Sequence, residues 1–139
     1  MEGSSMYTPP SARVSAAYRQ VDLNSQVLSA SPHGLIGLLF NELRACLNGA
    51  IGAMQRKDVA TKVRLIAKAS RLIDEGLMSS LDVAAGGELA ANLQRLYSYS
   101  LMRLAQAHAG SSVAIVEEVL QLLQPVMDGW SEIGGQARA

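Results

Sequence analysis

Residues 78–100 read MSSLDVAAGGELAANLQRLYSYS, a polar, glycine-containing bridge between two stretches of helical spacing. The bridge holds residues whose side chains hydrogen-bond to nearby backbone, followed by two glycines that let the chain change direction. These turn-building residues are Ser79, Ser80, Asp82, Gly86 and Gly87. Glu88 then suits the first turn of a new helix, because its charge complements the helix dipole. The bridge therefore predicts a helical hairpin.

Apolar residues recur every three or four positions on both sides of the bridge, which is the spacing of amphipathic helices. The expected helices span about residues 32–57, 59–81, 87–109 and 112–133. Ser31 and Asp58 are the expected caps of the first and second helices, and Ser111 or Ser112 caps the fourth. The Gly134–Gly135 pair is expected to end the fourth helix.

The same spacing predicts which side chains face the interior. In the second helix Val59 and Val63 are expected on the apolar stripe, opposite Lys62, and in the third helix Leu89 opens the apolar face. Pro125 lies inside the fourth helix and predicts a bend there, because proline removes one backbone hydrogen bond.

Four helices of this length, joined by short links, predict an all-α protein, an antiparallel four-helix bundle. Val14, Tyr18 and Val21 fall on one side of a short helical segment before the bundle, and so short a helix needs a surface to pack on. The expected parts of the chain are a flexible N-terminal tail at residues 1–12, a short helical cap segment and linker at 13–30, the bundle at 31–133 and a C-terminal tail at 134–139.

The composition argues against several classes of partner. Twelve Lys and Arg balance twelve Asp and Glu, and 49% of the residues are hydrophobic while 17% are charged. Nucleic acids and anionic membranes favour basic proteins, so we expect neither as a partner. No apolar run approaches the roughly 20 residues of a membrane span, so membrane insertion is not expected. A single cysteine fits a reducing compartment, and we expect a cytoplasmic protein.

Patterns typical of catalysis or metal binding are not evident in the sequence. His33 and His108 lie far apart, Cys46 has no Cys-x-x-Cys partner, and Gly86–Gly87 is not followed by the lysine of a phosphate-binding loop. We therefore expect no enzyme, no metal and no cofactor. Cys46 is expected to fill the core.

The turn does not explain three polar residues in the helix that follows it. Asn92, Tyr97 and Tyr99 lie in a helix that needs only aliphatic side chains to pack. One interpretation is structural, with the tyrosines bridging the core and water, and the other is a binding surface.

This part of the chain resembles the flagellar secretion chaperone family, FliS. The matching segments are Met78–Asp82 (MSSLD), Gly86–Ala90 (GGELA), Asn92–Leu93, Leu96–Tyr99 (LYSY) and Arg103–Leu104. Residues 30–40, ASPHGLIGLLF, resemble the start of the family's first long helix, and Trp130 fits its closing helix. The chain departs from the family at residues 40–43, FNEL, where Tyr-Asp-Gly-Ala is frequent, and at Pro125.

The resemblance implies a cytosolic export chaperone. Such a protein binds the disordered C-terminal segment of flagellin, prevents its premature polymerisation and delivers it to the cytoplasmic domain of the flagellar type III export gate. The residues expected to contact flagellin are Leu39, Phe40, Leu81, Asn92, Leu93, Leu96, Tyr97 and Tyr99. Val14, Tyr18 and Val21 are expected to cover the empty groove, and Tyr18 is also the candidate for docking to the export gate.

Two alternatives remain open at this point. A helical regulatory adaptor would use the same faces to bind a folded protein or, weakly, another copy of itself, without any disordered ligand. A chaperone of another exported subunit would share the mechanism and differ only in cargo.

Overall fold

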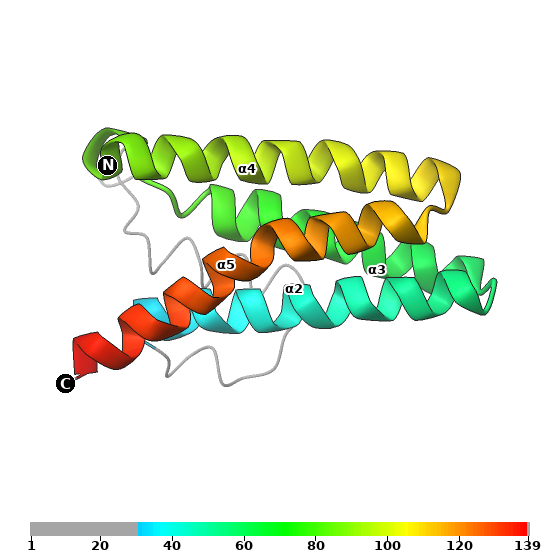
Figure 1. Ribbon diagram of the computed structural model, residues 1–139, viewed down its shortest axis with the longest axis horizontal. Coiled ribbons are helices and arrows are strands. Elements are labelled where there is room, and N and C mark those ends of the chain that lie inside the picture. The colour runs from blue at the N-terminus through cyan, green and yellow to red at the C-terminus, as the bar shows by residue number, and fades with distance from the viewer. Residues whose placement is uncertain (1–30, 139) are drawn as a thin grey trace, which may run out of the picture.

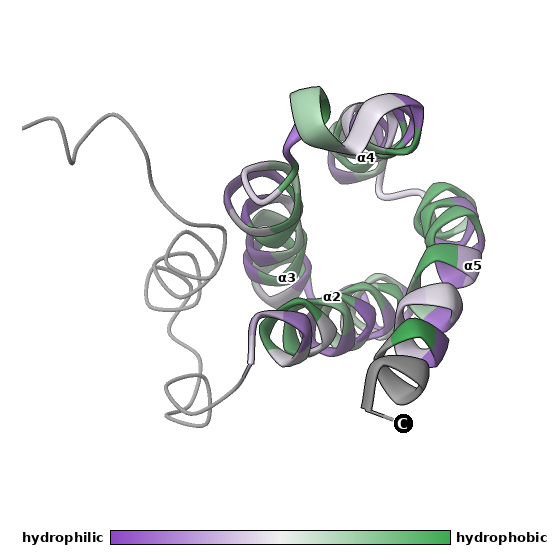
Figure 2. Cartoon of the chain, turned by 90° about the vertical axis from the view of Figure 1, so that its left-hand side faces the viewer, coloured by the Kyte–Doolittle hydropathy of each residue, from purple (hydrophilic) through white to green (hydrophobic). Residues whose placement is uncertain are grey.

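The computed structural model describes residues 31–138, and these form helices and short connections. In chain order the elements are α2 (Pro32–Gln55), α3 (Val59–Arg71), the π-helical segment η3 (Leu72–Met78), α4 (Val83–Gly110) and α5 (Val113–Arg138). The chain runs back and forth along the long axis of the molecule (Figure 1), and the helices surround a shared interior when viewed along that axis (Figure 2). The all-α bundle predicted from the sequence is confirmed.

Side-chain caps start the helices where the sequence predicts them. Ser31 Oγ accepts a hydrogen bond from the backbone N–H of Gly34 at 3.1 Å, and Asp58 Oδ1 accepts one from Thr61 at 3.2 Å. Of the two serines considered for α5, Ser112 provides the cap. Each such cap satisfies a backbone donor that has no partner within its helix and contributes about 1 kcal/mol.

The bridge reverses the chain earlier than expected. Asp82 Oδ1 accepts a hydrogen bond from the backbone N–H of Ala85 at 3.1 Å, so α4 begins directly after Asp82. Gly87 then has φ 61° and ψ −136°, a backbone conformation that residues other than glycine rarely adopt. It interrupts the helix after one turn. The continuous part of α4 thus begins after Gly87, near the predicted start, and one additional helical turn from Val83 precedes it. Gly87 redirects α4, and the turn itself lies before Asp82.

The second predicted helix consists of two segments, because α3 passes into the π-helical η3. A π-helix has a wider turn than an α-helix, and apolar spacing over seven residues does not distinguish the two. Gly76 of η3 faces Leu39 of α2, and a Cβ on Gly76 would lie 3.0 Å from both terminal methyl groups of Leu39. After η3, the hydroxyls of Ser79 and Ser80 donate to backbone carbonyls of the preceding turn.

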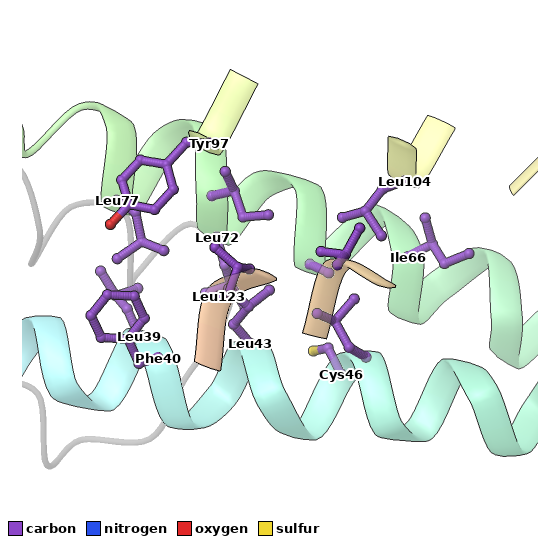
Figure 3. Packing of buried hydrophobic residues seen from close by; sticks show 14 of the residues in the cluster. Leu39, Phe40, Leu43, Cys46, Ile66, Leu72, Leu77, Tyr97, Leu104 and Leu123 are labelled. Carbon is purple, nitrogen blue, oxygen red and sulfur yellow. The ribbon is translucent and has the colours of Figure 1, made fainter. Parts of the chain in front are cut away.

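The core of the bundle is built around α2, which packs against both α3 and α5. Leucines dominate it, and aromatic residues lie toward one end (Figure 3). The large aliphatic side chains of the core that are completely shielded from solvent are Leu39, Leu43, Leu47, Leu72, Ile73, Leu104, Val116, Val119 and Leu123. In α5 the apolar period is buried from Val116 to Met127, whereas Ile133, further along the same helix, is 53% exposed.

At the start of α3 the predicted register is wrong. Val59 and Val63 are 62% and 41% exposed, whereas Lys62 is buried. The Lys62 ammonium donates hydrogen bonds to the backbone carbonyl of His108 at 3.2 Å and to Ser111 Oγ at 2.8 Å. It thus binds the negative end of the α4 dipole, and this contact outweighs the preference of lysine for solvent.

The apolar face of α4 is also shifted at its first turns. Leu89 is 70% exposed, and the neighbouring Ala90 is buried in its place. Leu89 and Ala90 both follow Gly87 in the continuous part of α4, whose buried residues Ala90, Tyr97 and Leu104 recur every seven positions. Leu89 lies one residue away from this buried line, so the error is in the choice of the buried face and not in the helical phase.

Helix α5 continues through Pro125 and ends at Arg138. Its course changes direction between its first and second halves (Figure 1). The Gly134–Gly135 pair does not end the helix, and the predicted C-terminal tail at residues 134–139 is wrong for this reason. Glycine within a helix costs only about 1 kcal/mol and does not force a stop. The expected tail and cap segment at residues 1–30 lie outside the described residues.

Candidate functional site

An apolar cavity of about 240 Å³ lies at the end of the bundle where α2 begins, between α2, η3, α4 and α5. We call it the end cavity. Its lining residues are Pro32, His33, Ile36, Phe40, Leu77, Ser80, Leu81, Leu93, Tyr97, Val126 and Trp130. A core cavity of roughly 150 Å³ is known to bind benzene. The end cavity is therefore large enough for an aromatic or a branched aliphatic side chain.

Several residues predicted from the sequence meet at this cavity. Phe40 of α2, Leu81 of the bridge, and Leu93 and Tyr97 of α4 all line it. These residues are distant in sequence, so the fold brings the predicted motifs together at one place. Leu39 is different, because it is completely buried and supports the cavity from the core.

Tyr97 crosses the interior from α4 toward Leu77 and Phe40 (Figure 3). Its side chain is 3% exposed, and burial raises the pKa of its hydroxyl to about 12. The phenol therefore stays neutral at physiological pH and keeps its proton as a hydrogen-bond donor. In a site that is otherwise almost wholly apolar, such a donor gives orientation to a bound group.

One side of the end cavity is formed by three aromatic rings, which we call the aromatic wall: His33, Phe40 and Trp130. The rings of His33 and Trp130 stack with centroids 4.6 Å apart, and Phe40 meets Trp130 edge-on at 6.5 Å. Two hydrogen bonds lock the stacked pair, from His33 Nε2 to the Trp130 carbonyl at 2.8 Å and from Trp130 Nε1 to the His33 carbonyl at 3.1 Å. A carbonyl oxygen only accepts, so Nε2 carries the imidazole proton.

The other predicted contact residues lie on α4 but not in the cavity lining. Leu96 is partly buried against the core, and Asn92 is exposed and accepts a hydrogen bond from Arg95. Tyr99 is 39% exposed and donates to Glu118 of α5 at 2.7 Å. That bond, followed by the one from Arg103, lowers the pKa of Glu118. Tyr99 thus links α4 to α5 outside the end cavity.

The aromatic wall is not predicted as part of the site by the sequence. From the sequence, His33 is considered as a metal ligand and lies in the segment that resembles the family's first long helix, and Trp130 fits the family's closing helix. Neither is predicted to be a binding residue. The available signal was that Trp130 is the single tryptophan of the chain and His33 follows directly after a helix cap. Their stacking requires the two ends of the bundle sequence to meet, which spacing along the chain does not reveal.

In the described part of the chain, no group of three His, Cys, Asp or Glu side chains is placed to hold a metal ion. Within residues 31–138, none of the helices combines the length and apolarity that crossing a membrane requires. The groups that the site offers to a ligand are its apolar lining and a few hydrogen-bonding groups.

Cys46 is expected to react slowly with iodoacetamide in the folded protein. Burial, and next the carboxylate of Glu42, raise the pKa of its thiol from 9.0 to about 11, and only the thiolate reacts. Because the folded pKa is the higher one, the stability that this thiol contributes is present below pH 9.0 and is lost as the pH rises toward 11. Equal alkylation rates in native and denatured protein, measured by mass spectrometry, would contradict this assignment.

Fold and site together define a helical-bundle protein with an apolar cavity at one end. The family model for the flagellar protein FliS matches residues 14–137, and the chain belongs to this family.

Three curated relatives are similar in sequence to this chain over most of their length. The flagellar secretion chaperone FliS of Salmonella typhimurium is 39% identical over 132 residues, which is 95% of this chain and 96% of the relative. The flagellar secretion chaperone FliSB of Pseudomonas aeruginosa is 43% identical over 116 residues, 84% of this chain and 91% of the relative. The Escherichia coli FliS is 38% identical over 121 residues, 87% and 89% of the two chains.

Proposed function

We propose that this protein is a cytoplasmic flagellar export chaperone without enzymatic activity. It holds the C-terminal segment of flagellin, prevents its premature polymerisation and delivers it to the cytoplasmic domain of the flagellar type III export gate. Membership of the FliS family, with relatives named flagellar secretion chaperones, supports the general role.

The observation that carries the proposal is the end cavity. The family motifs supply Leu81, Leu93 and Tyr97, and Phe40 stands where the family frequently has tyrosine. All four line one apolar cavity at the end of the bundle. A disordered segment that folds on binding needs such anchor sites, because burial of apolar side chains must offset the entropy lost on ordering. One apolar side chain of flagellin fills the cavity, and the Tyr97 hydroxyl donates to a polar group beside it.

Residues outside the cavity extend the contact. Asn92 and Tyr99 are exposed on α4, and Leu96 is partly buried between them, so a bound segment that continues along α4 meets all three. Asn92 then acts as a polar anchor. Leu39 does not touch the segment and acts through the packing beneath Phe40 and Leu77.

Calorimetric titration with a peptide of the C-terminal segment of flagellin from the same cell tests the proposal. We expect one-to-one binding with a negative heat-capacity change from apolar burial, and no binding of a matched N-terminal peptide. Absence of binding in a sample shown to be folded and helical would overturn the proposal. Self-association without any peptide would instead favour the regulatory adaptor.

Deletion of residues 1–21 is expected to increase both flagellin affinity and binding of a hydrophobic dye. An empty apolar cavity exposes surface that favours aggregation, and we propose that Val14, Tyr18 and Val21 cover it in the free protein. The same deletion removes Tyr18, the candidate for docking to the export gate, and should weaken that second interaction. Unchanged dye binding and unchanged affinity would exclude the cap.

A further inference from the structure

A second hollow lies on the other side of the aromatic wall. This polar groove has a volume of about 460 Å³ and runs between α2 and the C-terminal half of α5. It shares His33, Phe40 and Trp130 with the end cavity, so the two sites are adjacent and the aromatic wall separates them. The further lining residues are Gly34, Gly37, Leu38, Asn41, Arg44, Met127, Asp128 and Ser131.

Arg44 is the cation that lines this groove, and within residues 31–138 the acceptor found for its guanidinium is the sulfur of Met127. The side chain is partly buried, and Nη2 points at the thioether sulfur of Met127 at 3.3 Å, which is a weak acceptor. None of the ion pairs formed among residues 31–138 includes Arg44. A guanidinium has five N–H donors and prefers a carboxylate that it can bind with two of them.

Asp128, the acidic residue that lines the groove, is not the carboxylate partner of Arg44. Asp128 Oδ1 accepts a hydrogen bond at 2.9 Å from Gln124, one turn earlier on the same helix. The backbone of α2 is accessible along the groove, because a Cβ on Gly37 would meet no atom within 4 Å. A second chain can therefore approach α2 closely and bring its own carboxylate to Arg44.

We infer that the polar groove is a second contact site for the flagellin segment, in which Arg44 binds a carboxylate of that segment. The inference rests on the proposed function, because it assigns both sites to one bound chain. The apolar side chain in the end cavity and the carboxylate at Arg44 lie on opposite sides of the aromatic wall, and the chain between them crosses over Trp130. The cavity then supplies affinity, and the groove fixes the register of the segment.

Calorimetric titration of the flagellin peptide with Arg44→Gln, at low and at high salt, tests the inference. The variant is expected to bind at least about tenfold more weakly than the wild type at low salt, and to lose most of the salt dependence of binding. Arg44→Lys keeps the positive charge but loses the paired N–H donors, so its affinity for the peptide should lie between those of Arg44→Gln and the wild type. Arg64→Gln is the matched control, because it removes the same positive charge from an exposed position on α3.

A second arm identifies the carboxylate. Each Asp and Glu of the peptide is replaced in turn by its amide. One replacement should weaken binding to the wild type by the factor seen for Arg44→Gln, and should have no further effect on that variant. Wild-type affinity for Arg44→Gln, or losses that simply add for every acidic position, would overturn the inference while the proposed function stands. If the wild type binds no peptide, the proposed function fails and the inference falls with it.

Discussion

Leu43→Ala is expected to lower the free energy of unfolding by about 3 to 5 kcal/mol. Leu43 lies on α2 at the centre of the bundle and is completely shielded from solvent. Its truncation removes the transfer free energy of a buried aliphatic side chain and leaves a cavity that rigid neighbouring helices close only in part. The loss is a large fraction of the 5 to 15 kcal/mol that is typical of a domain.

Leu89→Ala is the control for this prediction, because it makes the same chemical change on the surface. Leu89 is 70% exposed, so its truncation should change the free energy of unfolding by no more than about 0.5 kcal/mol. Urea unfolding followed by circular dichroism measures both variants. Similar losses for the two leucines would contradict the placement of Leu89 outside the core.

Leu93→Asp is expected to weaken binding of the C-terminal flagellin peptide by about 100-fold or more. Leu93 lines the end cavity on α4, where an apolar side chain of the peptide has to lie. A carboxylate at this position would be desolvated by the bound peptide without a partner, which costs several kcal/mol. Each 1.4 kcal/mol of that cost weakens binding about tenfold.

Met102→Asp is the matched control. Met102 lies on the same helix but nine residues further on, which is two and a half helical turns, so it faces the opposite side. It is 49% exposed, and a charge there meets water in both the free and the bound protein. Equal affinity losses for the two variants, with circular dichroism showing both folded, would mean that the end cavity is not the anchor site.

The apolar spacing predicts much of this fold because α2 and α5 keep a regular period along their buried faces. Capping residues located helix starts equally well, since Ser31 and Asp58 bind the first backbone N–H groups directly. Both signals are local, and they depend on few interactions with the rest of the chain.

The predictions that failed depend on contacts between distant parts of the chain. Lys62 is buried because the end of α4 offers it a carbonyl and a hydroxyl, and no local pattern indicates that partner. Gly87 was recognised as a special residue, but its φ of 61° breaks a helix that Asp82 has already started. Leu89 lies one residue away from the buried line of Ala90, Tyr97 and Leu104, and the neighbouring helices decide which of these adjacent faces is buried.

The candidate site was predictable only where the family motifs fall on it. Phe40, Leu81, Leu93 and Tyr97 were found in this way, without any knowledge of the cavity that they share. His33 and Trp130 form the stacked pair of the wall from residues 97 positions apart, and neither stands out as a binding residue in its own segment. Arg44 becomes a candidate binding residue only when the structure places it in the groove beside Met127.

The central claim is that the flagellin segment binds at the aromatic wall, and the fluorescence of Trp130 tests it most directly. Trp130 is the only tryptophan of the chain, so its emission during titration with a tryptophan-free C-terminal peptide reports on the wall alone. We predict a saturable one-to-one change in emission, absent with the N-terminal peptide and absent in Leu93→Asp. Unchanged emission at peptide concentrations where calorimetry shows binding would place the segment elsewhere on the bundle and contradict the account.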